Sequence, residues 1–368
     1  MISCYLRVQD GHLRHRRLFD KRIEELKRCV AGKTAERFER ALVPIERFLS
    51  AEVHGSSKGA AVFSREGHQP YFLALQFAVP LPTWVTADML PNIYHLVELK
   101  DKYWRFILLV CSRDEIRMLS VNLGKVTLEL LRQRPELRRR VGREWTKEHY
   151  RAHRAARTRR FVDDAVNALS EVMSAGGYDH LILAGDRSMT ALVRRALPPR
   201  TAARLAGIIR NPGMTEACDV VSRSIEAFIE AEEKESCDAA GMLEERLLGG
   251  GLAVAGTRAS HFALRRGRVQ TLVMSTDYAP RPGWLCVSCR VERTAEGRPK
   301  RCRACGSRSL VDLEVREAML RLAEQRGIQV ELVRDSAALR RIGDVGCLLQ
   351  QHPGSRGTTR RNRAVTER

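Results

Sequence analysis

The sequence lacks a long apolar run, and this absence excludes a large class of proteins. A helix that spans a membrane needs about 18–20 consecutive apolar residues, and no run in the 368 residues reaches that length. The N-terminal residues Met1 to Leu6 also lack the charged-then-apolar layout of a signal peptide. We therefore expect a cytoplasmic protein that has no membrane partner.

Acidic residues are scarce relative to basic ones. The chain has 44 Asp and Glu residues against 64 Lys and Arg residues, so its formal net charge is +20 and its pI is about 10.1. Since 44% of the residues are hydrophobic, the chain can bury ordinary cores, and so much positive charge on a folded protein predicts a polyanionic partner. Nucleic acid and an anionic membrane are the candidates, and the lack of apolar runs favours RNA or a ribonucleoprotein.

The chain also lacks the cysteine framework of small secreted proteins. Six of its ten cysteines are scattered, mostly within apolar or helical patterns, whereas four form two CxxC pairs. Cys286 and Cys289 are separated by twelve residues from Cys302 and Cys305, and this spacing predicts one structural Zn²⁺ site in a reducing compartment. A closed set of four thiolates leaves no open coordination position for catalysis. The alternative is a redox-active CxxC pair or four unrelated cysteines.

A basic stretch over residues 132–160 is the second motif. It carries eleven arginines and one lysine against three glutamates, a net charge of +9. Guanidinium groups form forked contacts with phosphates, and aromatic or imidazole rings stack on bases. The alternative is a solvated helix face without a partner. We predict RNA contacts for the following residues of this stretch: Arg138, Arg139, Arg140, Arg143, Trp145, Lys147, His149, Arg151, Arg154 and Arg157.

Two patterns in the sequence are similar to catalytic motifs, but their predicted structural surroundings do not fit catalysis. Ser57 lies in a GxSxG pattern, but this pattern is placed between a helix and a strand, whereas a nucleophile elbow needs a strand followed by a helix. His149 and His153 have helical i,i+4 spacing, but Glu148 precedes the pair, whereas a zinc protease needs a glutamate inside it. We therefore predict no catalytic residue.

Changes of pattern divide the chain into three segments and a tail, each segment with helices and strands. In residues 1–91 we expect strands at 2–8, 60–63 and 71–77 and helices at about 18–30 and 34–51. In residues 92–235 we expect strands at 105–111, 116–121, 125–131, 179–184 and 205–209, a long helix ending near residue 174 and an acidic helix at 222–235. In residues 236–351 we expect helices at 239–248 and 313–325, another ending at 266, and strands at 269–274, 329–333 and 345–349. The fold class is therefore mixed α/β with three domains.

The order of these pieces resembles a known family. Gly251–Gly256, Gly267–Val269 and Thr271–Val273, followed by the cysteines, resemble the C-terminal domain of archaeal and eukaryotic peptide-chain release factors. His180–Gly185 and Gly213–Glu216 resemble their central domain, and the N-terminal segment fits their first domain. The chain is thus similar to the bacterial archaeo-eukaryotic release factor-like family, whose relatives include release factor 1 and pelota and whose members include the hibernation factor Balon.

The resemblance implies a domain for each segment. Residues 1–91 would be an N-terminal α/β domain, and residues 92–235 a central release-factor-like domain with the basic loop 132–160. Residues 236–351 would be an L7Ae-like α/β/α domain in which residues 284–307, the zinc knuckle, form a zinc-ribbon insertion. Independently of the resemblance, the polar composition of residues 352–368, with Gly, Pro and Arg, predicts a disordered basic tail.

Two departures from the family limit what the resemblance implies about function. The Gly-Gly-Gln motif of release factors is absent, and so is the Asn-Ile-Lys-Ser motif associated with stop-codon reading. We expect a monomeric, non-enzymatic factor that occupies the ribosomal A site in a tRNA-like manner, in hibernation or in rescue of stalled ribosomes. Its partners would be ribosomal RNA and a translational GTPase such as elongation factor Tu. The alternatives are a hydrolase of peptidyl-tRNA or RNA that uses Glu144, Glu148 or His149, and an RNA-binding regulator unconnected to ribosomes.

Overall fold

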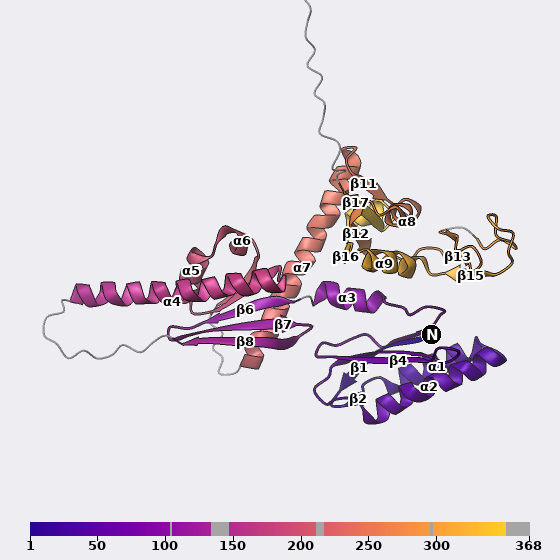
Figure 1. Cartoon of the computed structure of the whole chain (residues 1–368), viewed down its shortest axis with the longest axis horizontal. Helices are drawn as coiled ribbons and strands as arrows, with labels where there is room; N and C mark the ends of the chain where they lie inside the picture. Colours follow the sequence, from indigo (N-terminus) through magenta and orange to yellow (C-terminus); the bar gives the residue numbers. More distant parts are fainter. Residues whose placement is uncertain (104, 134–146, 211–216, 295–296, 351–368) are drawn as a thin grey trace, which may run out of the picture. The chain divides into compact units, whose positions relative to one another are not determined.

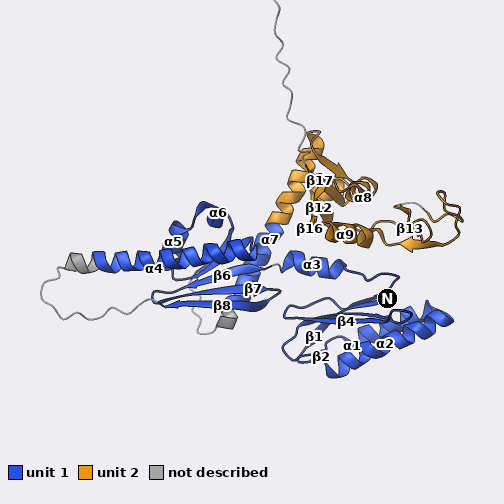
Figure 2. Ribbon diagram, viewed as in Figure 1, with its two compact units in different colours: residues 1–234 blue, residues 235–368 orange. Residues whose placement is uncertain are grey.

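The computed structural model confirms a mixed α/β chain with several sheets (Figure 1). It describes residues 1–103, 105–133, 147–210, 217–294 and 297–350, with the backbone alone at 147–151 and 217–219. The expected tail, 352–368, lies outside these residues. The chain forms two compact units, residues 1–234 and 235–368 (Figure 2). No helix among the described residues is both long enough and apolar enough to cross a membrane.

The first sheet is antiparallel and has the order β2-β1-β3-β4, with β5 also paired to β1. Its elements are β1 (Ile2–Gln9), β2 (His12–Leu13), α1 (Arg16–Arg28), α2 (Lys33–Ala51), β3 (Gly59–Arg65), β4 (Tyr71–Phe77) and β5 (Trp84–Ala87). Successive side chains of β1 point to opposite faces. Cys4 and Leu6 therefore pack with Phe19 of α1 and Ile45 of α2, whereas Tyr5 packs on the other face with Phe63.

Three elements of this region, β2, β5 and the helix α3 (Tyr94–Lys102), were missed by the sequence prediction. Pro80, Pro82 and Pro91 are typical of a domain boundary, yet β5 forms between these prolines and α3 follows them. Tyr5 donates its hydroxyl to the carbonyl oxygen of Asn92 over 2.7 Å, and Leu99 of α3 joins the core around Tyr5. These long-range contacts hold a helix whose local sequence carries no clear helical period.

The central sheet has the order β10-β9-β6-β7-β8, with β6, β9 and β10 parallel and β7 and β8 antiparallel. Its elements are β6 (Phe106–Cys111), β7 (Glu115–Asn122), β8 (Lys125–Gln133), α4 (Lys147–Gly176), β9 (His180–Gly185), α5 (Arg187–Ala196), α6 (Pro199–Ala202) and β10 (Leu205–Arg210). Phe161 and Leu169 of α4 are buried against one face. On the other face, Phe228 stacks on Phe106 with ring centroids 4.8 Å apart.

Phe228 belongs to α7 (Ala217–Leu248), and here the sequence prediction was wrong. We expected two helices, 222–235 and 239–248, but the structure has one continuous helix of 32 residues. The weak helix formers between them are kept helical by tertiary contacts. Ser236 donates its hydroxyl to Glu331 over 2.7 Å, and Ala240 and Leu243 pack on the third sheet.

The third sheet has the order β11-β17-β12-β16, in which β12 and β16 are parallel. Its elements are β11 (Ala253–Ala255), α8 (Thr257–Arg266), β12 (Val269–Ser275), α9 (Val315–Gln325), β16 (Gln329–Val333), α10 (Ala337–Arg341) and β17 (Val345–Leu349). Val273 and Val333 face α7 and α10, and α8 and α9 pack from the opposite side. This is the three-layer α/β/α arrangement that the sequence predicted. The zinc knuckle is inserted between β12 and α9 and belongs to a small sheet of β13 (Gly283–Cys286), β14 (Glu292–Arg293) and β15 (Leu310–Leu313).

Candidate zinc site and nucleic-acid interface

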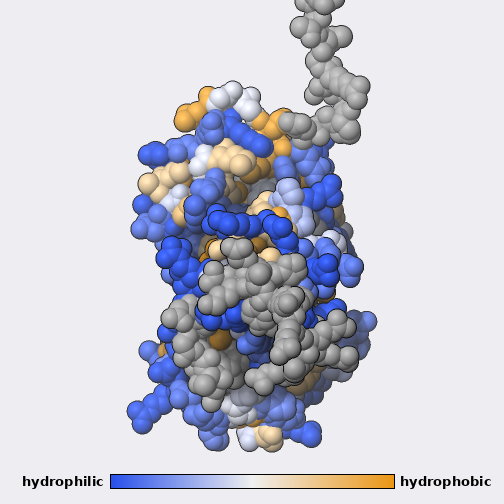
Figure 3. Space-filling view, turned by 90° about the vertical axis from the view of Figure 1, so that its left-hand side faces the viewer, coloured by the Kyte–Doolittle hydropathy of each residue, from blue (hydrophilic) through white to orange (hydrophobic). Residues whose placement is uncertain are grey.

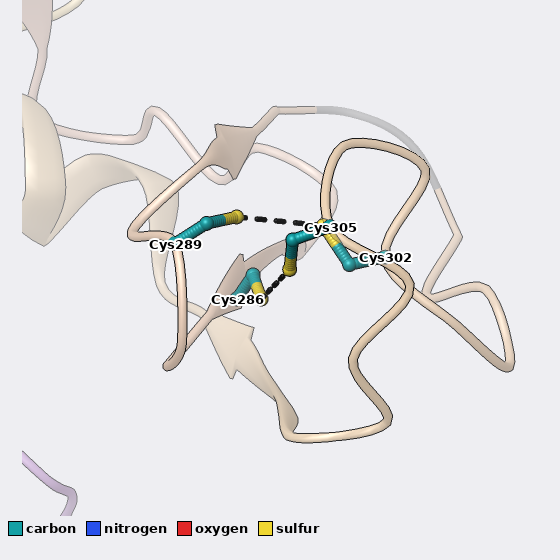
Figure 4. Close-up of side chains that lie close together, drawn as sticks. All are labelled: Cys286, Cys289, Cys302 and Cys305. Carbon is teal, nitrogen blue, oxygen red and sulfur yellow. Dashed lines mark hydrogen bonds between the residues drawn. The ribbon is translucent and has the colours of Figure 1, made fainter.

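The four predicted cysteines converge in the zinc knuckle (Figure 4). Sγ of Cys286 lies 3.5 Å from Sγ of Cys305, and Sγ of Cys289 lies 3.6 Å from Sγ of Cys302. All four sulfurs lie within 4.8 Å of one another. Tetrahedral zinc with Zn–S bonds of about 2.3 Å places its sulfurs about 3.8 Å apart. The sulfur atoms are therefore placed as a single Zn²⁺ requires.

Both CxxC turns have the same backbone. Arg290 follows the first pair with a φ of 55°, and Gly306 follows the second with a φ of 72°. Their backbone N–H groups donate to the carbonyl oxygens of Cys286 and Cys302, each over 2.8 Å. The two turns are also joined side to side, because the hydroxyl oxygens of Ser288 and Ser307 lie 2.8 Å apart.

These turns prepare the first sulfur of each pair to bind a metal. The backbone N–H of Cys289 is the main cause that lowers the pKa of Cys286, to about 6. The backbone N–H of Cys305 likewise lowers the pKa of Cys302. Thiolates are the form that binds zinc, so the first cysteine of each pair is poised as a ligand. Metal bound here would join the two turns and supply structure, not a catalytic position.

The knuckle has a small core of its own and a side-chain contact with the three-layer domain. Trp284 of β13 is 2% exposed and packs on Cys286 and Cys302. Glu292 of β14 lies 3.1 Å from Nε2 of His261 in α8, an imidazole that is itself buried. The hydrogen bond from His261 lowers the pKa of Glu292.

The predicted RNA-contact residues are only partly described. Arg138, Arg139, Arg140, Arg143 and Trp145 lie outside the described residues. Lys147, His149 and Arg151 belong to α4 by their backbone, but their side chains are not described. Arg154 is exposed and Arg157 is half-buried.

The start of α4 is a charged surface and not part of a core. Residues 152–160 include four arginines and no acidic residue, and each of the nine is exposed or half-buried. The buried face of the helix begins at Phe161. The face of the molecule in Figure 3 is mostly hydrophilic, with small apolar areas.

A shallow hollow adjoins this surface. Arg132 at the end of β8 and Arg157 and Arg160 on α4 line a space of about 580 Å³, together with Asp164 and Glu171. Arg132 and Arg160 belong to the basic stretch but were not among the predicted contacts. Because β8 and α4 are separated in sequence, their meeting could not be read from the motif.

The remaining candidate motif has a structural role. Ser57 is buried, and its hydroxyl oxygen lies 3.0 Å from the side-chain oxygen of Gln76, to which it donates. The structure shows the residue before β3, not at an exposed strand-to-helix turn. This agrees with the prediction that Ser57 is no nucleophile.

Known proteins show what the chain is similar to. Residues 91–228 match the sequence model described as bacterial archaeo-eukaryotic release factor family 10. A search of curated proteins finds no match.

Several solved structures match the chain at low sequence identity. The archaeal translation termination factor aRF1 is 15% identical, with 95% of this chain and 92% of that chain covered and a TM-score of 0.25. Archaeal Pelota, in a ribosome-bound model with ABCE1, is 14% identical, with 80% and 77% covered and a TM-score of 0.43. Dom34 of S. cerevisiae, described as a termination-like factor that interacts with Hbs1, is 9% identical, with 79% and 80% covered and a TM-score of 0.41.

The family match falls on the central sheet, α4 and the first part of α7, and it confirms the resemblance seen in the sequence. The chain is therefore similar to the bacterial archaeo-eukaryotic release factors, and the match to family 10 covers its residues 91–228.

Proposed function

We propose that this protein is a ribosome-associated translation factor that binds ribosomal RNA at the A site in a tRNA-like manner. Its role would be hibernation or rescue of stalled ribosomes. The observation that carries the proposal is the start of α4, which belongs to the matched domain. It presents Arg154, Arg157, Arg159 and Arg160 with no acidic residue among residues 152–160. Such a concentration of positive charge on an exposed helix favours phosphate as its partner.

We further propose that the protein does not release peptides. Release factors use Gly-Gly-Gln beside the peptidyl-tRNA ester, and this chain has no such motif. In its place, residues 140–147 read Arg-Val-Gly-Arg-Glu-Trp-Thr-Lys, whose bulky side chains would hinder the close approach that a Gly-Gly turn allows. A translational GTPase such as elongation factor Tu would be the delivery partner, and the protein would act as a cytoplasmic monomer with a structural Zn²⁺.

The competing function is hydrolysis of peptidyl-tRNA or RNA through a replacement loop. Glu144, Glu148 and His149 would be its acid and base. Glu144 lies outside the described residues, and Glu148 and His149 lie in the first turn of α4, where only the backbone is described. The described residues contribute no nucleophile with a base and an orienting group. We therefore rank binding above catalysis.

The test is sedimentation of the full chain with ribosomes across a salt series, combined with a peptide-release assay on ribosomes loaded with peptidyl-tRNA. We expect salt-sensitive co-sedimentation, cryo-electron microscopy density in the A site, and no release above background. Absence of co-sedimentation at about 50 mM salt, where phosphate contacts are strong, would refute ribosome association. Release that His149→Ala or Glu144→Ala removes, while binding persists, would establish the hydrolase.

A further inference from the structure

The zinc knuckle carries a positive surface of its own, distant in sequence from the basic stretch of the central domain. Residues 284–307 contain six cations and two acids, a net charge of +4. The structure engages one of the acids, Glu292, in its contact with His261. The other, Glu296, lies outside the described residues. The cation Arg298 pairs with Asp312 over 3.4 Å.

Five cations of the knuckle remain, and all are exposed. Across the described part of the chain, none of them pairs with a carboxylate. They are Arg290, Arg293, Lys300, Arg301 and Arg303.

The helices α1 and α2 offer a comparison, because several of their exposed cations are paired with acids. There, Arg16 contacts Asp20 and Glu46, Arg22 contacts Glu25, and Lys27 contacts Glu39. These helices are also rich in arginine, and their charge is partly compensated by these pairs, although Arg17, Arg37 and Arg40 are exposed without a salt bridge among the described residues. Like charges that are left together raise the energy of the folded state unless an anion neutralises them. The knuckle therefore has a charge pattern suited to an anionic partner.

The turn at Arg290 adds a second, independent argument. Gly306 occupies the equivalent left-handed position of the other CxxC turn, where glycine avoids the steric cost that a side chain meets. Arg290 adopts the same left-handed conformation, with a φ of 55°, despite its side chain, and so this turn carries a guanidinium group. Residues that break a local structural rule are expected at functional sites.

We propose that the zinc knuckle is a second RNA-docking surface, which binds phosphates through Arg290, Lys300, Arg301 and Arg303. Its chemistry is that of cations on a metal-fixed backbone: zinc would hold both turns rigid, so that little conformational entropy is lost when the cations meet the phosphates. This inference rests on the proposed function, because the RNA that it names is ribosomal. It assigns RNA contact to a module for which the sequence indicated a purely structural role.

The test compares three variants of the full chain. The knuckle variant is Lys300→Ala/Arg301→Ala/Arg303→Ala, and Arg290 is left in place so that the strained turn is unchanged. The control variant, Arg17→Ala/Arg37→Ala/Arg40→Ala, removes the same charge from exposed positions on α1 and α2. The rescue variant, Arg301→Lys/Arg303→Lys, keeps the charge. Zinc content and thermal unfolding are measured first to verify that each variant is folded.

Two readouts are taken across a salt series: binding to a fluorescein-labelled RNA hairpin and co-sedimentation with ribosomes. We expect the knuckle variant to bind both at least about tenfold more weakly, with a salt slope reduced by about 2 because up to three phosphate contacts are lost. The control variant should lose much less, and the rescue variant should stay close to the wild type.

Each other outcome has a definite meaning. Equal losses in the knuckle and control variants would overturn the inference and leave ribosome association standing. Weaker ribosome binding with unchanged hairpin binding would also overturn it, and would point to an acidic protein surface. If the wild type fails to co-sediment with ribosomes, the proposed function fails, and the hairpin measurement still decides whether the knuckle binds RNA.

Discussion

The imidazole of His261 in α8 and the carboxylate of Glu292 in β14 meet with Nε2 and Oε2 3.1 Å apart. This contact joins the zinc knuckle to the three-layer domain by side chains 31 residues apart in sequence. His261 is buried, and Glu292 is 25% exposed at its side chain. A partly buried pair of this kind stabilises more than an exposed one, because water and salt screen it less.

Glu292→Gln should therefore loosen the knuckle. We expect a loss on the order of 1 kcal/mol in the free energy of unfolding of the C-terminal domain, seen by hydrogen exchange of residues 283–294. The matched control is Asp312→Asn, which breaks the exposed pair with Arg298 in the same module and should cost much less. Equal effects of the two variants would show that the contact with His261 contributes no more to the free energy of unfolding than an exposed ion pair does.

The contribution of Glu292 should also depend on pH. Its pKa is lowered in the folded protein, chiefly by the hydrogen bond from His261. A lowered pKa means that the stabilisation is complete above the ordinary value of 4.5 and disappears as the pH falls through the folded value. The difference in stability between wild type and Glu292→Gln should shrink below about pH 4.5. Both proteins keep the same four cysteines, so acid release of zinc cancels in this difference.

The metal site makes a direct prediction. The purified protein should contain about one Zn²⁺ per chain, and Cys289→Ser should remove most of it, because three ligands no longer close the site. Unfolding of residues 235–350 should then occur at a lower temperature while residues 1–234 keep theirs. Cys237→Ser is the control, since Cys237 is exposed in α7 and far in sequence from the site. A well-folded wild type without zinc would end this interpretation.

The two CxxC turns can be tested by substitutions with opposite effects on backbone strain. Gly306→Ala places a side chain at a φ of 72°, although no atom lies within 4 Å of the new Cβ, so its cost is purely one of backbone strain. We expect about tenfold weaker zinc binding in a chelator competition, which corresponds to roughly 1–2 kcal/mol. Arg290→Gly relieves the strain in the other turn and should bind zinc up to a few fold more tightly.

The control for both turns is Gly297→Ala, which also has nothing within 4 Å of its Cβ but no positive φ. It should leave zinc affinity unchanged. Weaker zinc binding by Arg290→Gly would show that the arginine stabilises its turn. If the knuckle docks on RNA as proposed, Arg290→Gly should at the same time weaken RNA binding.

Regular periodicity and cysteine spacing made much of this structure predictable. The strands β4, β16 and β17 have the predicted bounds, and the four cysteines meet as their spacing indicated. The prediction failed for elements whose secondary structure depends on contacts with residues distant in the sequence. The helix α3 packs against the core around Tyr5. The helix α7 continues through Ser236, whose hydroxyl donates to Glu331 of β16.

In the candidate interfaces, too, some residues could be predicted from the sequence and others depend on the fold. The arginines of α4 were visible as a run of charge, but Arg132 joins them only through the fold. The knuckle cations were also visible in the sequence. Their importance could not be judged there, because it depends on which nearby acids are already paired with other groups, such as Glu292 with His261.

The last prediction concerns the exposed start of α4. Arg154→Ala/Arg159→Ala should weaken co-sedimentation with ribosomes and reduce the salt slope by about 1–2, because binding releases fewer counterions when phosphate contacts are lost. Stability should hardly change, since both side chains are exposed and the buried face of the helix begins at Phe161. The control is Arg37→Ala/Arg40→Ala, with the same loss of charge on α2. If both pairs reduce binding equally, net charge alone drives association and α4 is not the docking surface. If only the α4 variant reduces co-sedimentation, and Arg154→Lys/Arg159→Lys binds like the wild type, this helix binds phosphates through positive charge alone. Failure of the lysine variant would instead indicate the forked geometry that only a guanidinium group offers.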